Sequence, residues 1–304
     1  MKTFSPSSEA QLRYTYPQRI LLFFLVTFVC LIVAAIGVGV ITYGGMTTLS
    51  MRIGTVIQDV VLFILPAVFV AMKVAGKPAS LLEVNNDFSV GVLLWSLLAM
   101  VFSIPAMNAL VAWNENIVLP EALSGLEAWM QSNEESAKKS VELLFGGVSV
   151  GDLIVSLLIV AVLAAFSEEI FFRGALQRLL ASGPLSSHVA IWLTAFIFSA
   201  FHMQFYGFFP RLLLGAYFGY LLWWSRSLWI PVIAHTFNNG MVVYSTWHER
   251  VSAVKADSAS GGVADAVNGI QFDSPWAIII SMLLTALSLM ILYRVANKNS
   301  GNFD

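Results

Sequence analysis

Long apolar stretches alternate with short polar ones along most of the chain. Eight stretches carry few or no charges and approach the roughly 20 residues that a helix needs to cross the hydrocarbon of a bilayer. They are 20–43, 56–72, 88–113, 153–172, 189–209, 212–225, 228–247 and 276–293. The pattern predicts an all-α polytopic membrane protein with about eight transmembrane helices.

Two longer segments lack this apolar character. Residues 114–151 carry six glutamates among spaced leucines and a tryptophan, which predicts amphipathic helices outside the membrane core. Residues 250–275 are rich in Ser, Ala, Gly and Asp, which predicts a flexible loop. Both segments are expected outside the membrane, on the side opposite the termini.

Composition and charge narrow the class of protein. Hydrophobic residues make up 58% of the 304 and charged ones 11%, against roughly 25% charged in a soluble domain. The mean hydropathy of +0.79 agrees. A net charge of −2 argues against a nucleic-acid surface. Cys30 is the only cysteine, which leaves no internal disulfide and no cysteine metal cluster.

The placement of lysine and arginine predicts orientation, because cytoplasmic loops carry the excess. With the N-terminus inside, nine of these residues fall in inner segments and six in outer ones. The first apolar run is too long for a cleavable signal peptide, so we interpret it as a retained span. We therefore expect a multi-pass protein of a bacterial cytoplasmic membrane, with both termini cytoplasmic.

Two adjacent glutamates, Glu168 and Glu169, interrupt the fourth stretch, and Arg173 follows its end. A charged side chain at the bilayer centre costs roughly 2.5–3.5 kcal/mol on insertion scales, so such groups usually mark a working site. On an α-helix Glu169 and Arg173 share a face, whereas Glu168 lies about 100° round. We expect a Glu169–Arg173 ion pair that leaves Glu168 as a candidate general base. The alternative is that all three join helices structurally.

Two histidines and an asparagine fall inside other predicted spans. His202 lies in the fifth, and His235 and Asn239 share a face of the seventh. Glu168 with His202 could take the proton of a water molecule, while His235 and the Asn239 amide donate to a developing oxyanion. This set predicts hydrolysis of a peptide bond without a covalent intermediate.

Other chemistries use the same residues. Glu168, His202 and His235 match the ligand set of a catalytic zinc, although the chain has no His-Glu-x-x-His helix. A serine nucleophile is a weaker hypothesis because Ser167 and Ser199 lack a Gly-x-Ser-x-Gly elbow. Buried acids and histidines also build proton relays in transporters, but we find no matching halves.

Four motifs occur in a characteristic order. They are Glu168-Glu169-Ile-Phe-Phe-Arg173, Phe198-Ser-Ala-Phe-His202, Gly215-Ala-Tyr-Phe-Gly219 and Ser227-Leu-Trp-Ile-Pro231-Val-Ile-Ala-His235-Thr-Phe-Asn-Asn239. Together they resemble the CPBP family of intramembrane proteases, which includes CAAX prenyl endopeptidases and bacterial Abi and bacteriocin-processing proteins. The resemblance implies that Glu168, His202 and His235 are catalytic, that Asn239 completes the oxyanion site, and that Glu169 and Arg173 support them.

The resemblance also organises the chain. It implies a catalytic core at 152–247. The apolar pattern alone, without any resemblance, predicts three spans and an acidic loop at 1–151 and a loop, a last span and a tail at 248–304. The site would be buried among helices of the second half. The expected substrate is a peptide or membrane protein within the bilayer, lipidated or not. No cofactor is favoured, zinc is the alternative, and non-proteolytic binding, immunity or transport is the alternative class.

Two smaller patterns complete the prediction. Gly215 and Gly219 have the spacing that lets two helices approach closely, which predicts packing within the molecule. Four phenylalanines are candidates for a lateral path for an acyl or prenyl chain, although lipid-facing phenylalanine is the commoner explanation. They are Phe201, Phe205, Phe208 and Phe209.

Overall fold

The computed structural model describes residues 12–84, 88–258 and 274–299, and this part of the chain contains helices and no strand. The all-α prediction is confirmed. The helical elements are α1 (Tyr16–Thr42), α2 (Thr48–Gln58), η1 (Asp59–Ile64), α3 (Leu65–Ala75), α4 (Pro78–Leu82), α5 (Val90–Glu115), η2 (Glu121–Leu123), α6 (Ser124–Phe145), α7 (Val150–Ser156), η3 (Leu157–Leu163), α8 (Ala164–Glu169), η4 (Ile170–Gln177), α9 (Arg178–Ala181), α10 (Ser187–Phe201), η5 (Phe205–Gly207), α11 (Phe208–Ser225), α12 (Trp229–Ser258) and α13 (Pro275–Asn299).

Five helical runs are long and apolar enough to cross a membrane. They are Tyr16–Thr42, Thr48–Ala75, Val90–Glu115, Val150–Ala181 and Pro275–Lys298. The chain is thus a polytopic membrane protein. The other three apolar stretches form α10, α11 and α12, and their crossing of the bilayer stays a prediction.

Two predicted boundaries are wrong. The fifth stretch was expected to continue to residue 209, but its helix ends at Phe201 and the chain turns. The loop expected from residue 250 begins later, because α12 continues to Ser258. The rest of that loop, residues 259–273, lies outside the described residues.

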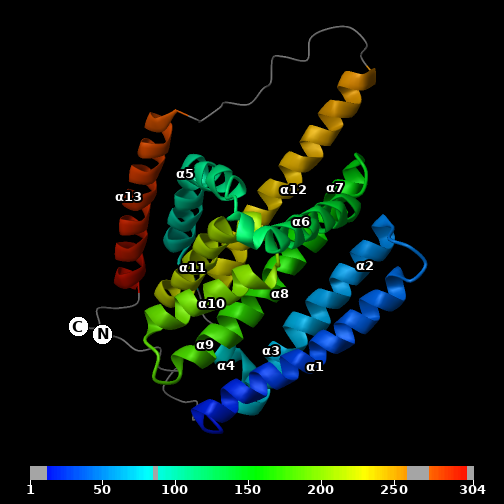
Figure 1. Cartoon of the computed structure of the whole chain (residues 1–304). Helices are drawn as coiled ribbons and strands as arrows, with labels where there is room; N and C mark the ends of the chain where they lie inside the picture. The colour runs from blue at the N-terminus through cyan, green and yellow to red at the C-terminus, as the bar shows by residue number, and fades with distance from the viewer. Residues whose placement is uncertain (1–11, 85–87, 259–273, 300–304) are drawn as a thin grey trace.

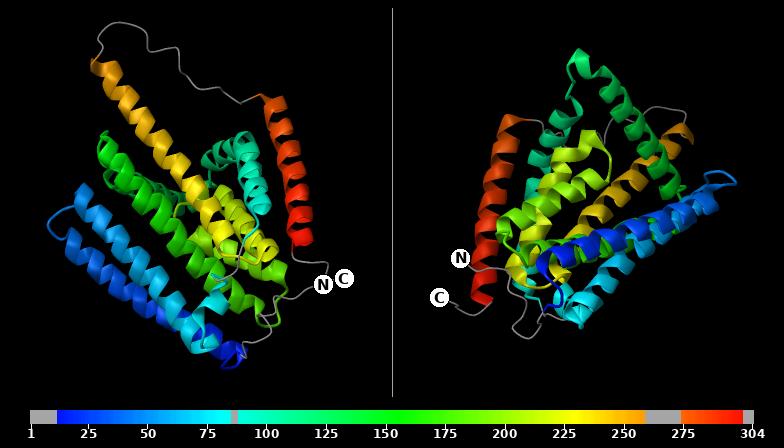
Figure 2. Two further views of the ribbon diagram at one scale, coloured as in Figure 1. Left: turned by 180° about the vertical axis from the view of Figure 1, so that it is seen from behind. Right: turned by 60° about the horizontal axis from the view of Figure 1, so that its bottom comes forward.

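The long helices form a bundle in which a central group of helices is flanked on two sides by other helices. Figure 1 shows α1 beside α2 and α3 on one side and α13 beside α5 on the other, with α8, α10, α11 and α12 between them. The two views in Figure 2 show the same arrangement. The amphipathic α6 contacts α2 and η5 and leads into α7 (Figure 1), and its place outside the membrane core stays a prediction. The central helices carry the four sequence motifs, and the flanking helices lie on either side of this central group.

The helix that carries the glutamates changes its winding on both sides of them. Leu157–Leu163 and Ile170–Gln177 have wide π turns, and the short α-helical piece Ala164–Glu169 lies between. Such turns are rare and often occur at functional sites. They also alter which side chains share a face, so spacing rules for a regular α-helix become unreliable here.

The glycine pair of α11 allows close packing, as predicted. A Cβ atom at Gly215 would lie 3.2 Å from the Cα of Ala195 on α10. One at Gly219 would lie 2.8 Å from a side-chain carbon of Ile191. Any larger residue would force α10 and α11 apart.

The same two glycines offer their carbonyls to the helix of the glutamates. Arg173 donates to the Gly215 oxygen at 3.0 Å, and Gln177 donates to the Gly219 oxygen at 3.1 Å. Both pairs are buried, where an unbonded polar group is costly. Two bonds at matching four-residue intervals therefore fix the position of η4 along α11.

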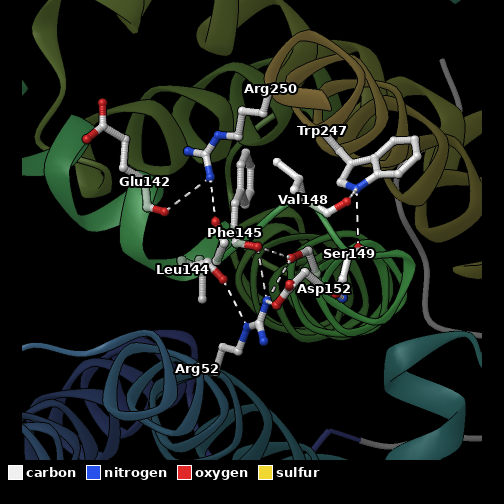
Figure 3. Close-up of polar contacts among 11 residues, drawn as sticks. Arg52, Glu142, Leu144, Phe145, Val148, Ser149, Asp152, Trp247 and Arg250 are labelled. Atoms are coloured by element: carbon white, nitrogen blue, oxygen red, sulfur yellow. Dashed lines mark hydrogen bonds and ion pairs between the residues drawn. The ribbon is translucent and has the colours of Figure 1, made fainter. Parts of the chain in front are cut away.

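The corner between α6 and α7 is held by an arginine from each of two other helices. Arg52 of α2 donates to the carbonyl oxygens of Leu144 and Phe145 at 3.1 and 3.0 Å and pairs with Asp152 at 3.1 Å. These carbonyls belong to the last turn of α6, where cations are favourable. Figure 3 shows Arg52 reaching this corner from one side and Arg250 from the other.

The contacts from α12 complete the corner. Arg250 donates to the Gly146 carbonyl at 2.8 Å, and the Trp247 indole donates to the Val148 carbonyl at 3.1 Å (Figure 3). Gly146 has φ +72°, and a Cβ there would lie 2.7 Å from the Arg52 guanidinium. The turn between α6 and α7 thus depends on a glycine and on donors from α2 and α12.

Replacing Arg52 with Ala should destabilise the protein. The variant loses the donors for two carbonyls of α6 and leaves Asp152 unpaired, with an expected cost of about 1–3 kcal/mol. The apparent Tm in detergent should fall by several degrees. Lys139→Ala is the control, because Lys139 and its partner Glu135 are about two-thirds exposed and such pairs contribute little. Equal Tm values for the two variants would contradict the role of Arg52.

A proline interrupts α5 beside α13. Pro105 lies inside α5 and has no N–H to donate, which weakens the helix there. At the next residue the Ala106 N–H donates to the Ser281 hydroxyl of α13 at 3.2 Å, and that hydroxyl donates to the Phe102 carbonyl at 2.6 Å. Ser281 therefore bridges two backbone groups of α5 that lie four residues apart.

Candidate active site

A cavity of about 560 Å³ lies between α5, α8, α11, α12 and the turn after α10. Its lining includes Glu168, His202, His235 and Asn239, so the structure brings together the four residues proposed from the sequence. Much of the remaining wall is apolar and includes Met100, Met107 and Met241, Leu214 and Phe218. The site thus combines a small polar group with a wide apolar surface.

Glu169 and Arg173 form the ion pair that their spacing predicts. The distance between Nη1 and Oε1 is 2.9 Å, and both side chains are fully buried. The Arg173 guanidinium also lies 4.4 Å from the centre of the Phe198 ring and 5.5 Å from that of Phe218. A buried charge needs such a partner and such contacts, so the pair holds this part of the helix in place.

His235 connects the two glutamates. Its Nδ1 lies 2.8 Å from Oε1 of Glu169, and its Nε2 lies 3.8 Å from Oε2 of Glu168. The ring stacks on Phe218 at a centroid distance of 4.8 Å. Because the Glu169 carboxylate accepts, Nδ1 carries a hydrogen and Nε2 is directed toward Glu168. Glu169 orients the histidine, whereas Glu168 borders the cavity.

His202 follows the last residue of α10. Its Nδ1 lies 2.9 Å from the carbonyl oxygen of Phe198. A carbonyl can only accept, so Nδ1 donates and Nε2 of the neutral ring keeps a lone pair. The sequence analysis lets Glu168 and His202 act on one water molecule, and both residues line the same cavity. The histidine within 4 Å of Glu168 is His235.

Asn239 is held by two side-chain contacts. Its amide nitrogen donates to the carbonyl of Val160, within the π turn η3, at 3.2 Å. Its oxygen accepts from the Asn238 amide at 3.3 Å. A primary amide has two N–H donors, so one remains for another acceptor. Asn239 therefore keeps a donor available at the cavity.

The comparisons with known proteins concern the part of the chain that builds this site. Residues 150–241 match the family described as type II CAAX prenyl endopeptidase Rce1-like. This segment is Rce1-like. No curated protein and no solved structure matches the chain. The match confirms the resemblance to CAAX proteases, and the Rce1-like segment contains Glu168, His202, His235 and Asn239.

Two charged residues near the site were not singled out from the sequence. Arg211 lines the cavity, although its sequence position suggested an outer loop. Asp59 lies in η1 and is 2% exposed. The η1 segment packs on α8, the short helix that contains both glutamates. A signal existed for Asp59, since it is an acid in an apolar run as Glu168 is. No spacing rule pointed to Arg211.

None of the four phenylalanines considered for a lateral path lines this cavity, and the path stays a prediction. Each packs on another aromatic ring elsewhere. The contacts are Phe201 with Phe63, Phe205 with Trp129, Phe208 with Phe196 and Phe209 with Trp113. The apolar wall comes instead from α5, α11 and α12.

A zinc site would need its ligands to converge on one point. Within the described ranges, no group of three His, Cys, Asp or Glu side chains is placed to hold a metal ion. Glu168, His202 and His235 do not form such a group there. The Nδ1 atom of His235 is used by Glu169 and that of His202 by a backbone carbonyl, which leaves Nε2 of each ring facing other partners.

Proposed function

We propose that this protein is an intramembrane endopeptidase in which Glu168 activates a water molecule to hydrolyse a peptide bond. The observation that carries the proposal is the connected series Arg173, Glu169, His235 and Glu168, which ends at the cavity. Membership of the segment in the Rce1-like family supports a CAAX-type protease. The apolar wall suits a substrate segment that is lipidated or itself apolar.

The proposed reaction begins at Glu168. Its carboxylate accepts a proton as the water oxygen attacks the substrate's carbonyl carbon, and the carbonyl electrons move to the oxygen. The lone pair on Nε2 of His202 accepts the water's other hydrogen in a hydrogen bond. The C–N bond then breaks, and the proton on Glu168 passes to the leaving nitrogen.

The oxyanion needs hydrogen-bond donors, and α12 supplies both. The free N–H of Asn239 is one donor, and Nε2–H of His235 is the second. His235 can donate from both nitrogens only as an imidazolium, so the proposed step uses this form, with Nδ1–H on Glu169 and Nε2–H on the oxyanion. Nε2 of His235 and Oε2 of Glu168 lie 3.8 Å apart, too far for a hydrogen bond to each other, so the first can contact the oxyanion while the second contacts the attacking water.

Cleavage of a defined peptide tests the proposal. The purified protein in liposomes should cleave an internally quenched peptide with a farnesylated cysteine, or a matched apolar transmembrane peptide, at one bond identified by mass spectrometry. A chelator should leave the rate within about twofold of the untreated rate, as expected for catalysis by side chains alone. Bound zinc whose removal stops cleavage would favour the metalloprotease alternative. No cleavage by folded protein would favour the non-proteolytic class.

A further inference from the structure

We propose that Arg211 binds a carboxylate of the substrate and so selects acidic peptides. The inference rests on the proposed function, because it concerns what enters the same cavity. Among the described residues that line the cavity, Arg211 is the one arginine or lysine. Arg173 does not line the cavity, because it is fully buried in its ion pair with Glu169. A cation in a largely apolar cavity attracts an anion more strongly than one in water.

The guanidinium is held in place on one side. It donates to the side-chain oxygen of Gln204 at 3.0 Å and to the Gln204 backbone carbonyl at 3.3 Å. It also lies against Gly207, where a Cβ would be 3.1 Å from Nη2. The turn after His202 therefore positions the arginine before any ligand arrives, which lowers the entropic cost of binding.

No protein carboxylate neutralises this arginine at close range. Within residues 12–84, 88–258 and 274–299, no carboxylate oxygen lies within the 4.0 Å of an ion pair. Glu168 acts on its charge from the cavity and Glu134 from α6, both at longer range. One oxygen of Glu134 is itself buried without a partner. Arg211 thus lies between two acids and is paired with neither.

The remaining donors suit a carboxylate. A guanidinium has five N–H groups, and the two bonds to Gln204 leave three. These can form the two parallel hydrogen bonds that arginine makes with a carboxylate, each charge-assisted. A neutral apolar peptide offers these donors only uncharged carbonyl oxygens, which form weaker bonds than a carboxylate, so the site favours the acidic ligand.

Binding to an inactive protein tests Arg211 separately from catalysis. In the Glu168→Gln background, fluorescence anisotropy would compare a labelled apolar peptide ending in a free carboxylate with the same peptide ending in an amide. Arg211→Gln should weaken binding of the carboxylate peptide by about 10- to 100-fold, as for a charge-assisted hydrogen bond of 1.5–3 kcal/mol. It should change binding of the amide peptide by less than about twofold.

A third peptide identifies the source of the carboxylate. It ends in an amide and carries one internal glutamate. Dependence on Arg211 with the first peptide indicates a terminal carboxylate, and dependence with the third indicates an acidic side chain. Arg211→Lys should recover part of the affinity, because lysine keeps the charge without the paired donors. Glu134→Gln should strengthen binding of acidic peptides, since it removes a competing charge.

Lys139→Gln is the matched control, because it also removes one positive charge but from an exposed pair on α6. It should leave all affinities unchanged. Equal losses for the acidic and neutral peptides, or no saturable binding of any acidic peptide, would overturn the proposal. If acidic peptides bind in a way that depends on Arg211 but the native protein does not cleave them, the proposed hydrolysis is wrong and the proposed role of Arg211 stands.

Discussion

Replacing Glu168 with Gln should abolish peptide hydrolysis while the protein still folds. Glutamine keeps the size of the side chain but cannot accept a proton, and loss of a general base typically costs about 10²–10⁴ in rate. The Glu168 side chain is 15% exposed and its nearest described charge partner is the His235 nitrogen at 3.8 Å. Replacing the Glu168 carboxylate with an amide therefore leaves no closely paired cation without its partner. The rate constant under saturating peptide is the measurement.

The control must separate catalysis from folding. Glu135→Gln removes an acid from the exposed surface of α6 and should leave the rate unchanged. The size-exclusion profile and apparent Tm of the Glu168 variant should equal those of the parent. Full activity in the Glu168 variant would refute the proposed role of this residue. A collapsed Tm would instead mean that Glu168 is structural.

Replacing Arg173 with Met should cause the largest loss of stability in the molecule. The substitution leaves the fully buried Glu169 carboxylate with only the His235 ring as a partner and the Gly215 carbonyl without its donor. Removing one partner of a buried pair costs about 3–5 kcal/mol. We expect low yield and a strongly reduced apparent Tm, measured by thermal unfolding in detergent.

Companion variants show whether the lost charge is the cause. Arg173→Lys keeps the charge but not the planar donor set, so its Tm should fall between those of the parent and Arg173→Met. Combining Arg173→Met with Glu169→Gln removes both charges and should restore part of the stability. A Tm for Arg173→Met close to that of the parent would contradict the importance of the buried pair.

The sequence was sufficient for features that depend on local spacing. Apolar runs located the helices because burial in lipid requires long uncharged segments. The Glu169–Arg173 pair followed from four-residue spacing, and the glycine pair of α11 packs as the same rule predicts. These relations involve residues on one helix, so they need no knowledge of how the helices are rotated.

Features that depend on the relative rotation of helices were not predictable. Whether His202 or His235 approaches Glu168 is decided by packing and by the two π turns, which no residue in the sequence announces. The end of α10 was missed because the apolar run continues beyond His202. The turn there includes Met203 at φ 55°, a left-handed conformation that glycine would normally signal. The same turn brings Arg211 to the cavity wall, which no spacing along one helix shows.

The hydroxyl of Ser281 has a consequence for the order in which the molecule is made. It belongs to α13, the last described helix to emerge during synthesis, yet it bonds the Ala106 N–H and the Phe102 carbonyl beside Pro105. Until α13 arrives, those two groups lack this partner within the bilayer. The wall of the cavity contributed by α5 is thus completed only after α13 has been made and inserted, more than 160 residues after α5 itself.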